Sequence, residues 1–275
     1  MNNIDLEEKT YTTHRKRVFP FFSVGLIIVG TAMLVGGGIF YDQAEASEHN
    51  IGKVISVSDN FELGKASSVN IDVGAGKLDI RPSSDDRIHI EGSVPEDYVI
   101  KENDGTLLVD LTQGWNLHFN PFDIGSSTVD AILYLPEIEY EELYLEVGAG
   151  EITVTDIKCR EASIDSGAGE ITVNGLTAKG LVRTDIGAGE ITITKAVTGG
   201  LDVDIGAGEF TYTGEVNGDI DVDCGAGDCN IALTNDQDEF YKKYSVDTDS
   251  GVGDIKVTFN NKLRNQKTET KRKLK

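Results

Sequence analysis

Apolar and polar residues alternate through most of the chain after residue 50, and the alternation returns at a fixed spacing. Leu201, Val203 and Ile205 are apolar, while the residues between them are aspartates. A period of two is typical of β-strands that bury one of their two faces. The pattern therefore predicts an all-β domain.

A Gly-Ala-Gly triplet followed by a charged residue marks each repeat of this alternation. The triplets begin at Gly74, Gly148, Gly167, Gly187, Gly206 and Gly225, and a Gly-Val-Gly variant begins at Gly251. From Gly148 to Gly225 the steps are 19, 20, 19 and 19 residues. Self-similarity at such a period is the signature of a repeat architecture in which each unit packs on its neighbours.

The triplet is predicted to be a corner. Ile186 and Ile191 are five positions apart and would face opposite ways in one straight strand, yet the pattern places both inside. The chain must therefore bend between them, and glycine supplies the backbone angles that a corner needs. We expect the alanine of each triplet to lie where a larger side chain would collide with the neighbouring unit.

Stacked corners of this kind predict a parallel β-solenoid with about 19–20 residues per rung, which buries a ladder of Ile, Val and Leu. An antiparallel β-sandwich of hairpins also fits the strand spacing and stays open. Residues 55–140 form an irregular β part, in which the turn at Glu102-Asn103-Asp104-Gly105 predicts antiparallel pairing that caps the stack. Residues 141–261 form the regular solenoid.

The N-terminal region predicts a single membrane span. Residues 21–40 are uncharged and mostly apolar, and as a helix they cover about 30 Å, the thickness of a bilayer core. Basic residues precede this run and acidic ones follow it, so we expect a cytoplasmic stub (1–18), a transmembrane helix (19–41), a linker (42–54) and an extracellular domain at the cell membrane. Ala44-Glu45-Ala46 also matches a signal-peptide cleavage pattern, so removal of the segment stays open.

Net charge separates the domain from its tail. The chain carries a net charge of −22, of which residues 1–41 account for +1, residues 42–261 for −29 and residues 262–275 for +6. Such an acidic body repels nucleic acid, which we exclude as a partner. The basic tail lacks apolar periodicity, so it is predicted to be disordered and to meet solvent, anionic wall polymers or lipid headgroups.

Carboxylates recur at equivalent positions on both sides of the corner, so stacking would turn them into ladders. Weak candidates for a cation ladder are Asp165, Asp185, Asp204, Asp223, Glu170, Glu190 and Glu209. Hard cations such as calcium take clustered carboxylate oxygens, but a solvated acidic surface explains the same residues and is our preferred interpretation. We therefore commit to no metal and no cofactor.

Two other groups of residues carry weaker hypotheses. Trp115, Phe119 and Phe122 share a loop that either stacks on sugar rings or plugs the solenoid end. Threonine pairs such as Thr192 and Thr194 line an outer face, a pattern of ice-binding solenoids that also follows from strand propensity.

Histidines and cysteines suggest no catalytic chemistry in the sequence. The four histidines have no acid or nucleophile partner at a recognisable spacing, so no catalytic triad is predicted. Cys224 and Cys229 should both point into the core across a corner, as free thiols or as a local disulfide.

The recurring Gly-Ala-Gly-Glu-Ile-Thr, the aspartate before it and Leu133-Tyr134-Leu135-Pro136 resemble the DUF4097 family over about residues 55–259. The resemblance implies a β-strand repeat protein described as a proposed adhesin, with no catalytic residues. Similar proteins with one N-terminal membrane segment occur beside envelope-stress regulators, which implies a role at the cell envelope.

Function is therefore expected to be non-enzymatic: a membrane-anchored surface protein that acts as an adhesive or binding module for a cell-wall polymer, a glycan or a membrane protein. One alternative is an envelope-stress accessory or sensor that contacts a membrane partner. Another is a glycan-active β-helix enzyme, which requires two carboxylates converging in one cleft about 5 to 9.5 Å apart.

Overall fold

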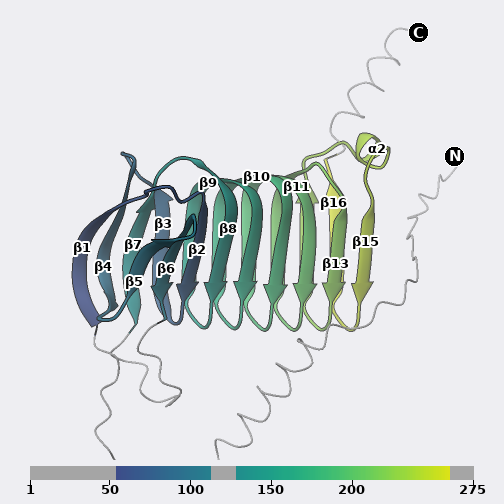
Figure 1. Ribbon diagram of the computed structural model, residues 1–275. Helices are drawn as coiled ribbons and strands as arrows, with labels where there is room; N and C mark the ends of the chain where they lie inside the picture. Colours follow the sequence, from purple (N-terminus) through teal and green to yellow (C-terminus); the bar gives the residue numbers. More distant parts are fainter. Residues whose placement is uncertain (1–53, 113–127, 261–275) are drawn as a thin grey trace, which may run out of the picture. The chain divides into compact units, whose positions relative to one another are not determined.

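The computed structural model describes residues 54–112 and 128–260, which are built almost entirely of strands (Figure 1). In chain order these elements are β1 (Val54–Glu62), β2 (Ser68–Val73), β3 (Gly76–Pro82), β4 (Arg87–Pro95), β5 (Val99–Asn103), β6 (Thr106–Leu111), β7 (Val129–Leu135), β8 (Glu139–Val147), β9 (Glu151–Ser166), β10 (Glu170–Ile186), β11 (Glu190–Ile205), β12 (Glu209–Val216), β13 (Ile220–Cys224), β14 (Asp228–Leu233), α2 (Gln237–Phe240), β15 (Val246–Ser250) and β16 (Asp254–Phe259).

Several expectations fall outside these residues. The stub, the membrane helix, most of the linker, the loop with Trp115, Phe119 and Phe122, and the basic tail belong to the parts of the chain that the structure does not describe. Among the residues that it does describe, no helix has the length and apolar character of a membrane span.

Parallel pairing between successive repeats builds the regular part of the domain. Ile152 pairs with Ile171, and Ile171 pairs in turn with Ile191, so each residue lies beside its counterpart one repeat away. The long strands β9, β10 and β11 each belong to two sides of the solenoid. The first half of each strand pairs with neighbours on one side, and the second half pairs with neighbours on the other. The parallel β-solenoid is thus confirmed, and the antiparallel sandwich is wrong.

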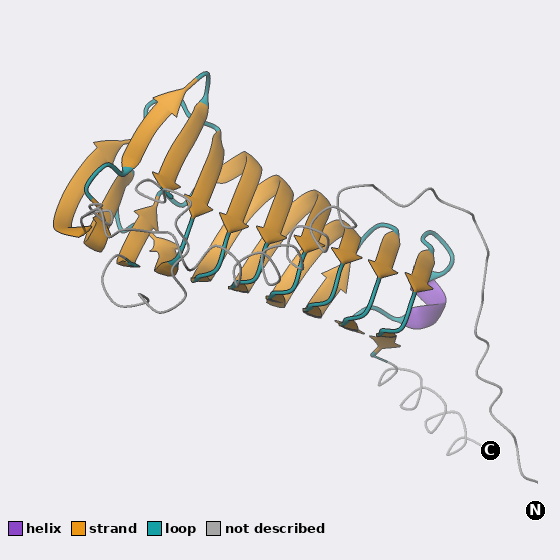
Figure 2. Cartoon of the chain, turned by 90° about the horizontal axis from the view of Figure 1, so that it is seen from below, coloured by secondary structure: helices purple, strands orange, loops and turns teal. Residues whose placement is uncertain are grey.

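We call the two sides of the solenoid face A and face B. Face A contains, in order of pairing, β5, β6, β2, β8, the second halves of β9, β10 and β11, then β13 and β15. Face B contains β1, β4, β7, β3, the first halves of β9, β10 and β11, then β12, β14 and β16. The Gly-Ala-Gly corners join face A to face B along one edge, which Figure 2 shows from below.

The N-terminal end departs from sequence order. The rung made of β2 and β3 lies between the rung of β6 and β7 and the rung of β8 and β9, so the earliest corner is the second rung of the stack. Antiparallel strands close this end: β5 pairs with β6, and β1 pairs with β4, which pairs with β7. The antiparallel pairing expected around residues 102–105 is confirmed, with positive φ at Asp104 and Gly105 in the turn.

The core is one continuous apolar ladder between the two faces. Ile171, Ile191 and Phe210, which succeed one another on face B, are each 0% exposed, as is Val203 on face A. Such full burial contributes about 1.5–3 kcal/mol for each large apolar side chain. The alternation seen in the sequence therefore separates core from surface as predicted.

Glycine, and not alanine, is the confined residue of each corner. A Cβ atom on Gly208 would lie 2.2 Å from the carbonyl oxygen of Gly189, closer than atoms can approach. By contrast, Ala188 and Ala207 are exposed, and Val252 takes the alanine position of the last corner with 87% of its surface exposed. The expectation of a confined alanine is wrong, because the glycines on either side of it, and most of all the one at the third position of the triplet, have their Cα against the backbone of the preceding rung.

Candidate functional site

One column of carboxylates runs along face A, two positions before each corner. In order along the stack its members are Asp110, Asp72, Glu146, Asp165, Asp185, Asp204, Asp223 and Asp249, each paired in register with the next. Asp110 was missed in the sequence because no Gly-Ala-Gly follows it. The sequence around it, Leu107-Leu108-Val109-Asp110-Leu111, has the same alternation as Val69-Asn70-Ile71-Asp72-Val73, and this similarity could have identified Asp110 as a member of the column.

A second column runs along face B, at the first residue after each corner. It contains Glu151, Glu170, Glu190, Glu209, Asp228 and Asp254, again in register. Lys77 continues the same row and its Nζ lies 2.5 Å from Oε2 of Glu151, and Asp130 pairs with Lys77 on its other side, so a cation interrupts the row between two acids. The predicted ladders of acidic residues are therefore present on both faces.

An open groove follows the corner edge beside the face B column. Its walls are the alanine and the second glycine of successive corners, together with the face B carboxylates from Glu151 to Asp228. We call this groove, together with the two carboxylate columns that lie before and after the corner edge, the acidic ridge. The same side chains recur on the acidic ridge at every rung, so a ligand would meet several equivalent binding positions in a row.

Burial alters the face A column. It raises the pKa of Asp72 from 3.8 to about 6, helped by the negative charges of Glu146 and Asp110. It also raises the pKa of Asp204 to about 6, where Asp202 and Asp223 add repulsion. A carboxylate partly removed from water and lined up with other carboxylates is more easily protonated, since both effects oppose its charged form.

The C-terminal part of face A is doubly acidic. Asp202, Asp221 and Asp247 form a third row two residues before the first column. In this row the preceding rung carries Arg183, whose Nε lies 3.8 Å from Oδ2 of Asp202. Negative charge is therefore densest over the last three rungs.

The metal hypothesis gains no geometric support in the described part of the chain. Within residues 54–112 and 128–260, no group of three or more His, Cys, Asp or Glu side chains converges on a point. Neighbouring carboxylates stand in a line about 4.8 Å per rung apart, whereas calcium needs six to eight oxygens at about 2.3–2.6 Å. Calcium binding by the ladder stays a prediction to test.

A threonine array lies on face B beyond the acidic ridge. Thr153, Thr172, Thr192 and Thr211 stand in register. The row then continues into Asn230 and Lys256. The array spans four rungs, and its regularity follows from the same repeat that aligns the carboxylates.

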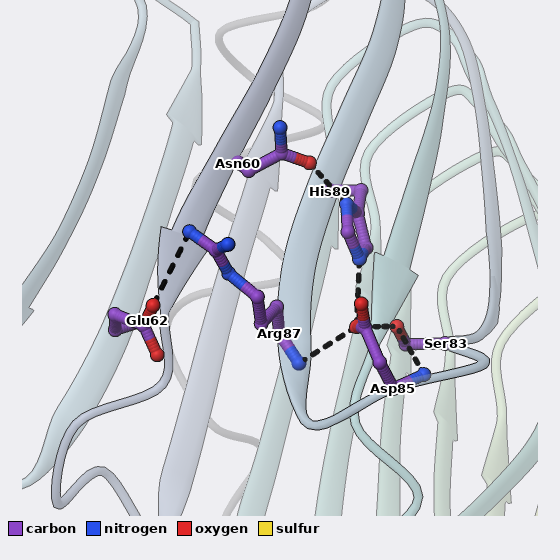
Figure 3. Close-up of polar contacts among 6 residues, drawn as sticks. All are labelled: Asn60, Glu62, Ser83, Asp85, Arg87 and His89. Carbon is purple, nitrogen blue, oxygen red and sulfur yellow. Dashed lines mark hydrogen bonds and ion pairs between the residues drawn. The ribbon is translucent and has the colours of Figure 1, made fainter.

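His89 has an acidic partner that the sequence did not reveal. Its Nε2 lies 2.7 Å from Oδ1 of Asp85, its Nδ1 contacts the amide oxygen of Asn60, and Ser83 Oγ donates to the same Asp85 oxygen at 3.0 Å (Figure 3). These bonds, with that from the Arg87 amide, lower the pKa of Asp85. Asp85 is the centre of this cluster, and both Ser83 and His89 bond to it and not to each other, so the order of a serine–histidine–aspartate triad is absent here. The cluster ties β1 to the turn before β4.

The three cysteines are structural. Cys159, Cys224 and Cys229 are all buried and free, as expected for the latter two from their corner positions. Burial raises the pKa of Cys229 to about 12, so this thiol stays protonated and unreactive at neutral pH. Cys224 donates to the carbonyl of Gly227 at 3.0 Å, as Ser166 does to Gly169 at 2.7 Å at the equivalent corner.

Comparison with protein families identifies the repeat. The family described as Toastrack DUF4097 matches residues 66–271. The chain belongs to this family. The resemblance seen in the corner motif is thereby confirmed, and the match extends beyond the last strand of the Toastrack domain.

Solved structures with a similar trace are distant in sequence. They include a proposed cell adhesion protein from Clostridium sporogenes, at 14% identity and a TM-score of 0.40, covering 76% of this chain and 100% of that one. A proposed adhesin from Bacteroides fragilis gives 15% and 0.43, covering 79% and 100%. A proposed lipid-binding protein from Parabacteroides distasonis gives 13% and 0.40, covering 76% and 98%. No curated protein matches the chain significantly.

Proposed function

We propose that this Toastrack protein is a non-enzymatic binding module displayed at the cell envelope, and that its acidic ridge binds an extended cationic partner. The observation that carries the proposal is the register of the carboxylates, which repeat over successive rungs on both sides of the corner edge and, on face B, line an open groove. Many weak, equivalent ion pairs suit a polymer or a chain segment with spaced amines.

The same regularity argues against catalysis at the ridge. A glycoside hydrolase needs one proton donor and one nucleophile or base with different pKa values, set apart by different surroundings. Within face B, Glu170, Glu190 and Glu209 occupy equivalent and exposed positions, which favours repeated binding over a single reaction centre.

Display outside the cell is part of the proposal and has its own test. The apolar segment 21–40 and its flanking charges favour an anchor with the domain outside. Protease added to intact cells should then remove the domain after Tyr41 and leave the first 18 residues protected. A domain that stays intact until the cells are lysed would contradict this topology.

Binding at the ridge is tested with the full chain in detergent micelles and a defined lysine oligomer as the probe. Replacing Glu170, Glu190 and Glu209 by glutamine should weaken binding about tenfold, since three exposed ion pairs are worth about 0.5 kcal/mol each. The matched control replaces three exposed glutamates elsewhere, Glu91, Glu137 and Glu142, and should change affinity less than about twofold.

Two outcomes would contradict the assignment of the ridge. One is an equal loss of affinity in the two triple variants, because binding would then follow net charge alone. The other is no measurable binding of the oligomer at physiological salt, where a pairing surface of this charge density retains attraction.

A further inference from the structure

Asparagine followed by glycine occurs at two places in the chain, Asn174-Gly175 and Asn217-Gly218. This pair is chemically labile, because glycine has no Cβ atom to keep its backbone nitrogen away from the asparagine side chain. The nitrogen can attack the side-chain amide carbon and close a five-membered ring, which is one reason why asparagine counts among the thermolabile residues. The two pairs occupy different positions in the solenoid, so folding should affect their reactivity differently.

Asn174 lies inside a strand that is paired on both sides. Within β10 its backbone is in register with Thr155 of β9 and with Thr194 of β11. Its Oδ1 accepts a hydrogen bond from Thr194 Oγ1 at 3.4 Å. Ring closure requires the backbone and the side chain to rotate until the glycine nitrogen reaches the amide carbon, so Asn174 would first have to leave the ladder. The strand pairing should therefore protect it.

Asn217 lies in an exposed turn, just after β12 ends and before β13 begins. The amide of Gly218 donates to no backbone carbonyl of the described residues, so its nitrogen is available for attack. Nδ2 of Asn217 donates to Oε1 of Glu215 at 3.0 Å, which holds the carboxamide at the surface, where water reaches it. The strand pairing that protects Asn174 is therefore missing at Asn217.

The fold itself requires the glycine of this turn. Asn235 bonds both backbone groups of Val216, with its Oδ1 3.0 Å from the amide and its Nδ2 2.9 Å from the carbonyl oxygen, so the chain enters the turn in a fixed position. A Cβ atom on Gly218 would then lie 1.8 Å from the carbonyl oxygen of Gly199 in the preceding rung. Any residue other than glycine would collide there, so the labile pair exists wherever asparagine stands at position 217.

We propose that Asn217 is a site of spontaneous deamidation in the folded protein, whereas Asn174 is protected by the solenoid. The nitrogen of Gly218 gives its proton to hydroxide and forms a bond to Cγ of Asn217. The bond from Cγ to Nδ2 breaks, and Nδ2 takes up a proton from water and leaves as ammonia. Water then adds to one of the two carbonyl carbons of the succinimide ring and opens it. Opening on one side gives aspartate, and opening on the other gives isoaspartate, in which the side-chain carbons have become part of the backbone.

Either product changes the turn between β12 and β13. A carboxylate at position 217 would remove the donor that Glu215 now accepts from and would place a third acid between Glu215 and Asp219 in the sequence, so like charges would repel. Isoaspartate would also lengthen the backbone by one carbon beside Gly218, whose Cα lies against Gly199. The modification should therefore loosen this turn and add charge where the solenoid is already most acidic.

Peptide mapping by mass spectrometry tests the proposal with the full chain in detergent micelles, incubated at mildly alkaline pH in water labelled with oxygen-18 and digested afterwards in ordinary water. The peptide that contains Asn217 should gain one labelled oxygen as it loses its amide. It should react at least about tenfold faster than the peptide that contains Asn174, because reaction at Asn174 requires local opening of the ladder. Asn217→Gln is the matched control: its ring would have six members and closes far more slowly, so its peptide should stay unlabelled.

The same measurement in guanidinium chloride supplies the reference rates. With the solenoid unfolded, neither Asn-Gly pair is held by strand pairing, so the two rates should agree within about twofold. Equal rates in the folded protein would overturn the proposal, because the fold would then not distinguish the two sites. The proposal would also be wrong if Asn217 stayed unlabelled in the folded protein over the time that labels it in denaturant, since the turn would then hold the Gly218 nitrogen away from the side chain.

Discussion

The two carboxylate columns of the acidic ridge flank the same corner but differ in their surroundings. On face A, Asp72 and Asp204 are partly buried, and their pKa values are raised to about 6. On face B, Glu170, Glu190 and Glu209 are exposed. The face B column also contains the exposed aspartates Asp228 and Asp254, so it is the position before or after the corner, and not the length of the side chain, that separates the partly buried Asp72 and Asp204 from the acids of face B.

The comparison indicates a division of roles. The face B column keeps its carboxylates in solvent, where they attract cations at little cost to the fold. The face A column links the stability of the fold to protonation, because each raised pKa marks a carboxylate whose charge opposes folding. The corner keeps the two columns apart and in register, so a change at the corner should affect both cation attraction and the stability of the fold.

The largest effect is expected at the corner that joins the columns. Gly208→Ala should destabilise the domain by about 2–3 kcal/mol, since its Cβ would meet the carbonyl of Gly189, whereas Ala207→Leu should change stability by less than about 0.5 kcal/mol at its exposed site. Urea unfolding of the two variants measures the difference. Equal destabilisation would show that the alanine is confined after all.

This contrast also shows how far the sequence determines the fold. The nearly equal spacing of the triplets is enough to align Ile152, Ile171 and Ile191, because chemically equivalent repeats stack with like residues in register. The one extra residue of the 20-residue step is absorbed by a register shift between Ala178 and Leu181. The same spacing does not say which residue of a corner approaches the neighbouring backbone. That depends on the direction of each Cα–Cβ bond, and the alanine was misplaced for this reason.

The irregular part of the chain was less predictable for a different reason. Leu78 pairs with Ile152, which is far away in the sequence, so the neighbours of the rung of β2 and β3 cannot be predicted from the repeat period. The contact between His89 and Asp85 forms across a turn between β3 and β4, where a four-residue spacing carries no meaning without the turn geometry. Both features depend on tertiary arrangement, which a local pattern does not encode.

A smaller effect should distinguish the columns by pH. Asp204 has a folded pKa of about 6 against an ordinary 3.8, so its contribution to stability is fully present below about pH 3.8 and is lost as pH rises through 6. Asp204→Asn removes the charge and should stabilise the protein at pH 7.5 by about 0.5–1 kcal/mol, after allowance for solvent screening at a partly exposed group.

Thermal unfolding of matched variants at pH 4 and pH 7.5 measures this difference. The gain from Asp204→Asn should shrink toward pH 4, where both proteins are neutral at this position. Glu209→Gln, on the exposed column, should shift stability by no more than a few tenths of a kcal/mol at either pH. A gain of equal size from the two substitutions would remove the distinction between the columns.

The smallest expected effect concerns calcium. Two unit charges about 5 Å apart in water repel by about 0.8 kcal/mol, and each interior carboxylate of a column has two such neighbours. Diffuse screening relieves this repulsion, so sodium chloride and calcium chloride at matched ionic strength should raise the melting temperature almost equally. Among the described residues the carboxylates stand in a line and no three of them converge, so calcium should stabilise the protein little more than screening does.

Specific calcium binding would instead add a stabilisation that grows with the ratio of the calcium concentration to the dissociation constant. A calcium-specific rise of several degrees, removed by a chelator and by Asp185→Asn combined with Asp204→Asn, would show that face A is a cation site.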